Sequence, residues 1–386
     1  MSSKEVKEHN IIPALKLIDR VCDVWLEVRT GGFLKRIATV MQEPFPVLRN
    51  LRLIYMKLMD EIIPVIPAEF LGGSAPRLQH LFLYGIPFPA LPTLLLSTSD
   101  LAQLELRIIP STGYISPEAM VVGLAALPRL RTLVIEFQSA SPRPDLTPPP
   151  VTRTVLPALT SFQFKGASEY LEDLVARIDV PQLNGIHIYY LNQLVDFQVV
   201  QLSRFIDRSV GPKLALFKHA HVTFDSNQVS FNTYHHENDP DTDMPYATTT
   251  ISCKEIDYQI SHMAQVLGHY SAALSNVVHL DLEVDSDENR QLDGLDGIEW
   301  LLRQFSTVKT LYVTQELAGY LALALEDITA EMVAEVLPSL DLICLAGQPE
   351  SSIEKFIAAR QLSGLPVTVI SSEKELDERI ESYVSK

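Results

Sequence analysis

The chain has 386 residues, of which 47% are hydrophobic, so it is long enough to bury a large core. Its formal net charge of −17 disfavours phosphate backbones and anionic lipid headgroups, and we expect neither a nucleic acid nor a membrane partner. The three cysteines, Cys22, Cys253 and Cys344, are widely spaced and form no Cys-x-x-Cys pair, which argues against a disulfide framework and a structural zinc site. With no apolar stretch at the N-terminus, these features predict an intracellular protein, cytoplasmic or nuclear.

A six-residue pattern of the form Leu-x-x-Leu-x-Leu recurs along the chain. Successive copies begin 23 to 32 residues apart, except for one gap of 94 residues. In each copy the closing apolar positions alternate with polar ones, which is typical of a strand with one buried face. The copies begin at Val21, Leu48, Leu78, Leu101, Leu130, Leu159, Leu183, Val277, Val308 and Leu340, and weakened copies are found near 214 and 247.

One such unit cannot bury its apolar face alone, so we expect the copies to stack as neighbouring strands of a parallel sheet. The segments between strands must then cross over, several of them as helices. Ser116 precedes a proline and an acidic residue, and Ser168 precedes a second amphipathic run, so both are predicted helix caps. A longer helix is expected over 254–274, and capping patterns begin at 351 and 372.

The predicted organisation is an N-terminal segment over 1–20, a repeat domain over 21–370 that ends in a strand at 365–370, and a C-terminal helix over 371–386. Two insertions interrupt the repeats. The first, 139–153, contains the five prolines of SASPRPDLTPPP, and the second, 226–250, is polar, acidic and weakly patterned, which favours a long loop.

The segments APRLQHLFLYGIPFPALPTLL, GYISPEAMVVGLAALPRLRTL, SEYLEDLVARIDVPQL and EVLPSLDLICLAGQP resemble those of fungal F-box and leucine-rich-repeat proteins. The resemblance covers most of residues 20 to 370. It implies an α/β leucine-rich-repeat solenoid, that is, a right-handed, horseshoe-like β-α superhelix, here with irregular repeats. In that family an F-box docks on the adaptor of a cullin-type ubiquitin ligase, and the repeats recruit the protein to be ubiquitylated.

No F-box-like helical block is evident in this sequence, and the fragment 66–71, which superficially resembles the start of one, lies between two predicted strands. We therefore expect that fragment to be a crossover, and we expect no docking on the ligase adaptor. The predicted function is a non-enzymatic protein–protein interaction module, with substrate recognition for a ubiquitin ligase as the role that the resemblance implies. The alternative is a structural repeat scaffold, or a degenerate F-box relative that acts without the adaptor.

The sequence contains no nucleotide-binding loop, nucleophile elbow or metalloprotease motif, so we expect no catalytic site and no cofactor. Histidines gather at 219, 221, 235 and 236, and the last two stand beside Glu237 and Asp239. Imidazole and carboxylate groups are metal ligands in general. Ligands on a long loop are not preorganised, however, so an ordinary solvated loop without a metal is the favoured interpretation.

The remaining candidate is the concave face of the sheet, formed by the polar positions of each strand. Aromatic and arginine side chains contribute most to protein interfaces, and several fall on two adjacent predicted strands. The predicted partner-binding residues are His80, Phe82, Tyr84, Glu105, Arg107, His187, Tyr189 and Tyr312.

Overall fold

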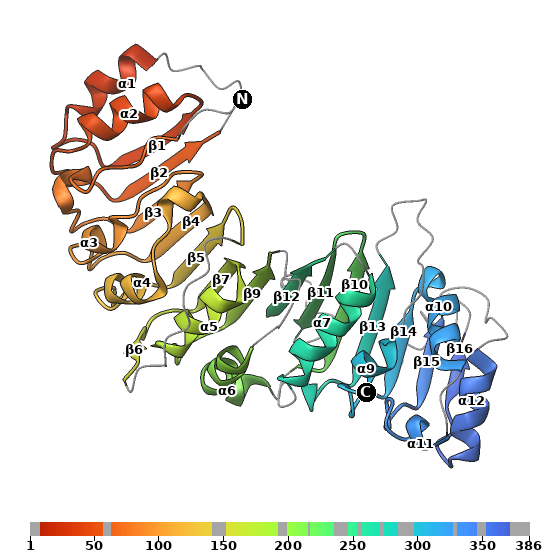
Figure 1. Cartoon of the computed structure of the whole chain (residues 1–386). Coiled ribbons are helices and arrows are strands. Elements are labelled where there is room, and N and C mark those ends of the chain that lie inside the picture. Colours follow the sequence, from red (N-terminus) through yellow and green to blue (C-terminus); the bar gives the residue numbers. More distant parts are fainter. Residues whose placement is uncertain are drawn as a thin grey trace. The chain divides into compact units, whose positions relative to one another are not determined.

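The computed structural model describes residues 8–56, 63–140, 152–191, 199–214, 217–234, 246–253, 256–270, 274–284, 297–326, 330–345 and 353–370 (Figure 1). Within these residues the chain is a mixed α/β protein, and fourteen of its strands belong to one sheet. It divides into two compact units, Met1–Ile186 and His187–Lys386, called here unit 1 and unit 2.

The strands of unit 1 follow one another in chain order, each parallel to its neighbour. They coincide with the predicted copies of the repeated pattern, so those strand predictions are confirmed. The strands are β1 (Asp23–Val28), β2 (Asn50–Tyr55), β3 (His80–Tyr84), β4 (Gln103–Ile109), β5 (Thr132–Phe137) and β7 (Ser161–Gly166), and a separate parallel pair is formed by β6 (Thr154–Val155) and β8 (Ile178–Asp179).

Helices and short turns connect these strands and cover one face of the sheet in unit 1 (Figure 1). Ser116 is a helix N-cap as predicted, and its side chain accepts a hydrogen bond from the backbone N–H of Ala119. The cap predicted at Ser168 is wrong by one residue, because Ala167 is the N-cap and Ser168 the first helical residue. The connecting elements are α1 (Glu8–Leu15), α2 (Gly31–Val40), η1 (Phe70–Gly73), α3 (Leu91–Leu95), η2 (Ser111–Gly113), α4 (Pro117–Leu124) and α5 (Ser168–Ala176).

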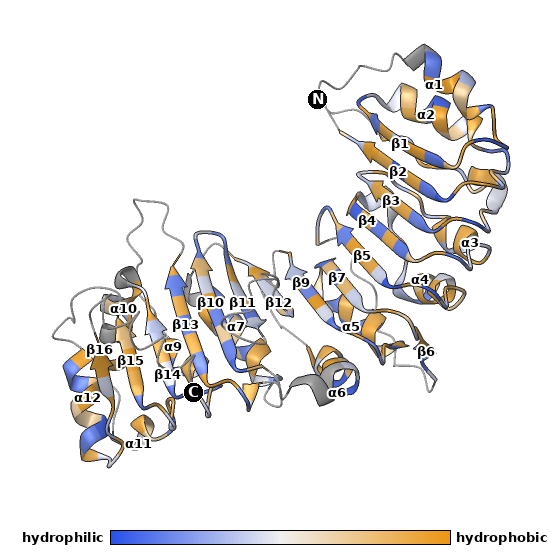
Figure 2. Cartoon of the chain, turned by 180° about the vertical axis from the view of Figure 1, so that it is seen from behind, coloured by the Kyte–Doolittle hydropathy of each residue, from blue (hydrophilic) through white to orange (hydrophobic). Residues whose placement is uncertain are grey.

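The core of unit 1 is built from the three apolar positions of each repeated pattern. In the copy that contains β5, for example, Leu130, Leu133 and Ile135 are at most 1% exposed. Buried and half-buried side chains alternate along β2 and β7, whereas on β5 Val134 and Glu136 are buried as well. Figure 2 shows the alternation of polar and apolar residues as alternating colours. Equivalent buried side chains come from Leu48, Leu51 and Leu53, from Leu78, Leu81 and Leu83, from Leu101, Leu104 and Leu106, and from Leu159, Phe162 and Phe164.

One backbone connection recurs from strand to strand. The N–H groups of Gln79 and His80, just before β3, both donate to the carbonyl oxygen of Arg49, at 2.8 and 3.0 Å. The same two-to-one connection precedes β2, β4, β5, β7 and β9 (Gly185–Tyr190), and in unit 2 it precedes β13 (His279–Val284), β14 (Thr310–Val313) and β15 (Leu342–Leu345). Each turn is therefore fixed by the backbone of the preceding one.

Unit 2 departs from this simple order. Its strands follow β9-β12-β11-β10-β13-β14-β15-β16, where β10 is His219–Asp225, β11 is Gln228–Tyr234, β12 is Ala247–Ser252 and β16 is Thr368–Ile370. The chain enters at β10, returns antiparallel through β11, and reaches β12 before it crosses to β13, which is parallel to β10. The prediction that 226–250 is a loop is thus wrong at β11 and β12, and a purely parallel sheet is also wrong. The weakened copy near 214 is displaced, because its buried positions are Phe217, Ala220 and Val222.

The helices of unit 2 are α6 (Val200–Leu214), α7 (Ile256–Gly268), α9 (Ile298–Leu302), α10 (Gln315–Glu326), α11 (Ala330–Val333) and α12 (Ile353–Leu362). Helix α7 is shorter than the predicted 254–274, and β16 confirms the end of the strand predicted at 365–370. The C-terminal helix over 371–386, the proline run, His235, His236, Glu237 and Asp239 lie outside the described residues. Among the described helices, none has the length and apolar character needed to cross a membrane.

Candidate functional site

The face of the sheet opposite the helices in unit 1, called here the open face, carries the polar positions of the strands. Parallel register aligns them in rows: Trp25, Arg52, Phe82 and Glu105 are successive partners across β1 to β4. Neighbouring strands lie about 4.8 Å apart, so the side chains of one row touch. The open face is therefore a continuous surface whose composition is set strand by strand.

The first three members of this row form an aromatic–arginine–aromatic stack. The guanidinium carbon of Arg52 lies 5.1 Å from the ring centroid of Trp25 and 4.0 Å from that of Phe82. Trp25 is 74% exposed, an unusual position for the largest apolar side chain. Within the described part of the chain, no acceptor bonds the Nε of Arg52, so ring faces rather than hydrogen bonds hold this group.

Two of the predicted residues flank the stack. His80 is exposed and Tyr84 is half-buried on β3, and Tyr84 stands opposite Arg107 on β4. Phe82, His80 and Tyr84 are among the residues predicted from the sequence, but Trp25 is not. The available signal was its place in VCDVWL at 21–26, where it occupies an outward position of the first copy.

Arg107 has intramolecular partners on the open face. It pairs with Glu105 at 3.0 Å and with Glu136 at 2.7 Å, and Glu136 also accepts a hydrogen bond from Gln163 at 2.8 Å. A β-bulge between Leu106 and Ile109 shapes this end of β4, where Ile108 adopts a φ of 53° that is rare for a β-branched residue. Arg107, predicted as a partner-binding residue, thus also belongs to an ion-pair cluster within the chain.

Glu136 is the buried member of the cluster, with a side chain 10% exposed. Burial raises its pKa above the ordinary value; Arg107 and Lys165 lower it, and Glu105 raises it. A carboxyl group whose pKa is raised on folding stabilises the fold when protonated, and this contribution is lost as the pH rises through the folded-state pKa. The positive charge of Arg107 thus offsets the free-energy cost of burying ionised Glu136 near neutral pH.

We expect Arg107→Met to lower the free energy of unfolding by about 2 kcal/mol near pH 7.5, because it leaves Glu136 buried and ionised. Near pH 5 the loss should shrink to below about 1 kcal/mol, since Glu136 then takes up a proton. Urea denaturation at both pH values measures the difference. Adding Glu136→Gln is the control that should remove the pH dependence, and an equal loss at both pH values in the single variant contradicts the assignment.

In unit 2 the predicted residues are dispersed. The hydroxyl group of Tyr189 lies 3.0 Å from the side-chain oxygen of Gln228, and Tyr312 is half-buried opposite Asp281 and Cys344. His187 is half-buried, and burial lowers its pKa, which favours the neutral ring. These residues do not form one cluster in the way that His80, Phe82 and Tyr84 do.

A histidine–carboxylate cluster lies on β10 and β13. His219 Nε2 is 2.8 Å from Asp281, His221 Nε2 is 2.9 Å from Glu283, and the ring of His279 lies 6.2 Å from that of His219. His219 and His221 were grouped in the sequence with the histidines at 235 and 236. Their pairing with Asp281 and Glu283 was not predicted, because it depends on β10 and β13 being neighbours. Within the described residues, no group of histidine, cysteine and carboxylate side chains has the arrangement needed to hold a metal ion.

The nearest approach to a catalytic arrangement also belongs to this cluster. The hydroxyl oxygen of Thr223 lies 3.3 Å from His221 Nε2, the same nitrogen that faces Glu283. A nucleophile–base–acid relay requires the hydroxyl and the carboxylate to meet different ring nitrogens, so that the base can take a proton while the acid orients it. Here the hydroxyl group and the carboxylate meet the same nitrogen, so the arrangement does not have the geometry of such a relay.

Comparison with known proteins gives no family assignment for this chain. No protein-family model matches the chain, and no curated protein sequence matches it either.

Proposed function

We propose that this protein is a non-enzymatic recognition module, a leucine-rich-repeat solenoid that binds a protein partner through the open face of unit 1. The repeat assignment is supported by the alternating burial of the strands and by the recurring backbone connection between successive turns. The resemblance to F-box and leucine-rich-repeat proteins implies substrate recognition for a cullin-type ubiquitin ligase. Because no docking on the ligase adaptor is expected, the alternative is a structural repeat scaffold or a degenerate F-box relative that acts without the adaptor.

The observation that carries the proposal is the stack of Trp25, Arg52 and Phe82. Tryptophan, tyrosine and arginine dominate binding energy at interfaces, because they bury large areas at a small cost in side-chain entropy. A guanidinium held between two rings is preorganised, so it loses little freedom when a partner's carboxylate or carbonyl binds it. His80 and Tyr84 extend the same surface and give it polar contacts.

The test begins with identification of the partner by photo-crosslinking from position 84. We expect the double variant Trp25→Ala/Phe82→Ala to weaken the affinity for that partner by about 2 kcal/mol or more, which is roughly 30-fold, because it removes both faces of the stack. Isothermal titration calorimetry with purified proteins measures the change. Trp300→Ala is the matched control, because Trp300 is a 59% exposed tryptophan on α9 in unit 2.

Two results decide the proposal. Unchanged affinity in a well-folded double variant would show that the open face of unit 1 is not the binding surface. A loss of folding instead of affinity, seen by circular dichroism, would show that the stack serves the fold of unit 1. In that case the single change Tyr84→Ala, which leaves the stack intact, still separates binding from stability.

A further inference from the structure

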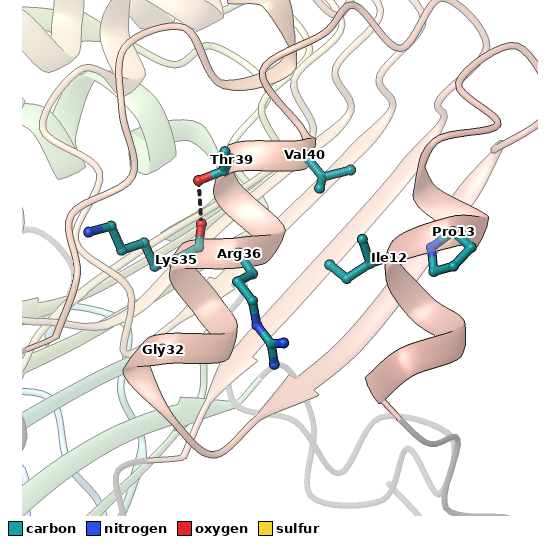
Figure 3. A pocket seen from close by; sticks show the side chains of 7 residues that line it. All are labelled: Ile12, Pro13, Gly32, Lys35, Arg36, Thr39 and Val40. Atoms are coloured by element: carbon teal, nitrogen blue, oxygen red, sulfur yellow. Dashed lines mark hydrogen bonds between the residues drawn. The ribbon is translucent and has the colours of Figure 1, made fainter.

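A hollow of about 530 Å³ lies between α1 and α2 of unit 1. Figure 3 shows Ile12 on α1, and Arg36 and Val40 on α2, pointing into the space between the two helices. Lys35 and Thr39, which also line it, are exposed, so the hollow is open to solvent. An apolar surface that is buried gives firmer evidence of an interaction, because another group must cover it, and such a surface lies in unit 2.

The buried surface in unit 2 is a small apolar cluster on the neighbouring strands β14, β15 and β16 (Figure 1). Leu342, Cys344 and Ile370 are 6%, 4% and 6% exposed, and Tyr312 packs against them. Cys344 stands in register with Tyr312 on one side and Ile370 on the other, so these side chains share one face of the sheet. This is also the face of Asp281, the partner of Tyr312 on β13, and it is called here the Asp281 face.

Neighbouring strands do not account for the burial of this cluster. In the described part of the sheet β16 is the last strand, so Ile370 has a neighbouring strand on one side only. In unit 1, Trp25 occupies an outward position of the edge strand β1 and is 74% exposed. Ile370 at a comparable position is 6% exposed, so a further segment lies over it. Asp281 and Glu283 on β13 are half-buried, which confines this cover to β14–β16.

The chain that follows β16 has the sequence of an amphipathic helix. Residues 371–386, which lie outside the described residues, begin with the capping pattern of 372–375. Four large apolar residues then recur at spacings of four, three and one, which places them on one side of a helix, while charged residues fill most of the other positions. These four, called here the apolar stripe, are Leu376, Ile380, Tyr383 and Val384.

The length and position of this segment fit the cluster. Leu376 is six positions after Ile370, a reach of up to about 20 Å in extended chain, whereas neighbouring strands lie about 4.8 Å apart. A helix over 373–384 is about 18 Å long, enough to cross β16, β15 and β14. Two other segments adjoin these strands outside the described residues: 346–352 has no large apolar residue, and 285–296 has two leucines.

We propose that residues 371–386 dock as an amphipathic helix on the Asp281 face, with the apolar stripe against the cluster of β14–β16. The occupant of this apolar surface is thus a segment of the same chain, and its charged residues face solvent. Tyr312, one of the residues predicted to bind a partner, then contacts the chain itself. A partner reaches this part of the sheet only by displacing the segment. The inference is independent of the function proposed for unit 1.

Cys344 lies in the cluster and therefore reports on its cover. N-ethylmaleimide labels a buried thiol only when local opening exposes it, and mass spectrometry of the digested protein follows each cysteine separately. Cys253, which directly follows β12 in the same unit and is 7% exposed, is the internal control for opening elsewhere. Cys22 is exposed and shows the rate of an accessible thiol.

Two double variants of the full chain provide the comparison. Leu376→Asp/Ile380→Asp places two carboxylates in the apolar stripe. Ser382→Asp/Ser385→Asp adds the same two charges on the opposite side of the helix, and it is the matched control.

We expect Cys344 to react slowly in the wild type and at least about tenfold faster in Leu376→Asp/Ile380→Asp, because the stripe no longer binds the cluster. The rate at Cys253 should stay unchanged, and the control variant should behave as the wild type does. Added carboxylates disfavour the reactive thiolate, so their charge does not by itself cause faster labelling.

Four results would overturn the proposal. Equal labelling of Cys344 in the wild type and in the stripe variant would show that 371–386 does not cover the cluster. Faster labelling in both aspartate variants would exclude the helical stripe as the cause. Acceleration at Cys253 by the same factor would show that the segment stabilises unit 2 as a whole. A wild-type rate that falls as the protein concentration rises would assign the cover to a second copy of the chain. None of these results bears on the affinity change expected for Trp25→Ala/Phe82→Ala.

Discussion

Leu133→Ala is expected to lower the free energy of unfolding by about 2 to 5 kcal/mol. Leu133, the second residue of β5, is fully buried and stands in register with Leu104 on one side and Phe162 on the other. Removing its side chain loses the transfer free energy of the deleted atoms. It also leaves a cavity that the flanking strands of a hydrogen-bonded sheet cannot close.

Urea denaturation followed by circular dichroism measures this loss, and hydrogen exchange locates it, because unit 1 and unit 2 need not unfold together. Thr132→Ala is the matched control: it lies next to Leu133 but on the open face and half-exposed, so its change should stay within about 0.5 kcal/mol. A loss below about 1 kcal/mol for Leu133→Ala would contradict the burial assigned to β5.

The strands were predictable because their signal is local. A strand with one buried face alternates polar and apolar residues over a few positions, and the pattern around Leu130 contains this information completely. Helix α4 was predictable for the same reason, since Ser116 and the residues after it contain a complete start signal. These elements need no knowledge of what lies beside them.

The order of β10, β11 and β12 was not predictable, because strand direction and strand neighbours are set by contacts between distant residues. The sequence from 226 to 250 contains no leucine, and its alternation uses valine, phenylalanine and threonine, as in Val229, Phe231 and Thr233, all of which are buried. The Leu-x-x-Leu-x-Leu pattern is therefore not recognisable there, and the segment was predicted to be a loop. The β-propensity of valine, phenylalanine and threonine is the signal that was available.

The same distinction applies to the candidate site. Outward positions such as Phe82 and Tyr84 follow from alternation within one strand, and the structure places them on the open face as expected. The stacking of Arg52 between Trp25 and Phe82, and the pairing of Arg107 with Glu136, depend on the register between neighbouring strands. Register is a property of pairs of strands, and single-strand patterns do not contain it.

Arg360→Met is expected to lower the free energy of unfolding by about 3 kcal/mol or more. Arg360 on α12 is 1% exposed, and its guanidinium donates to the backbone carbonyls of Val336, Leu337 and Leu340 at 3.3, 3.1 and 2.9 Å. Leu337 has a φ of 49°, so the turn that bears these carbonyls departs from ordinary backbone conformations. Arg360 therefore fixes the turn before β15 to the helix after it.

Methionine fills a similar volume and keeps the apolar contact with Phe356, whose ring centroid is 5.7 Å from the guanidinium carbon, but it donates no hydrogen bond. All three buried carbonyls then lose the guanidinium, and only that of Leu337 is known to keep another donor, the backbone N–H of Leu340 at 3.0 Å. This lost pairing rather than lost packing accounts for the destabilisation. Arg360→Lys should recover part of the stability, because an ammonium group has three donors but lacks the planar spread that reaches both sides of the turn.

Arg303→Met is the control for removing an arginine from the same unit. Arg303 stacks on Trp300 and pairs with Glu335 at 3.5 Å, a partner whose side chain is 65% exposed, so its loss should cost below about 1 kcal/mol. Urea denaturation ranks the three variants, and hydrogen exchange should show the increase for Arg360→Met in β15 and α12. Equal stability of Arg360→Met and Arg303→Met would mean that water replaces the guanidinium at the three carbonyls, and that α12 is attached to the sheet by its apolar residues alone.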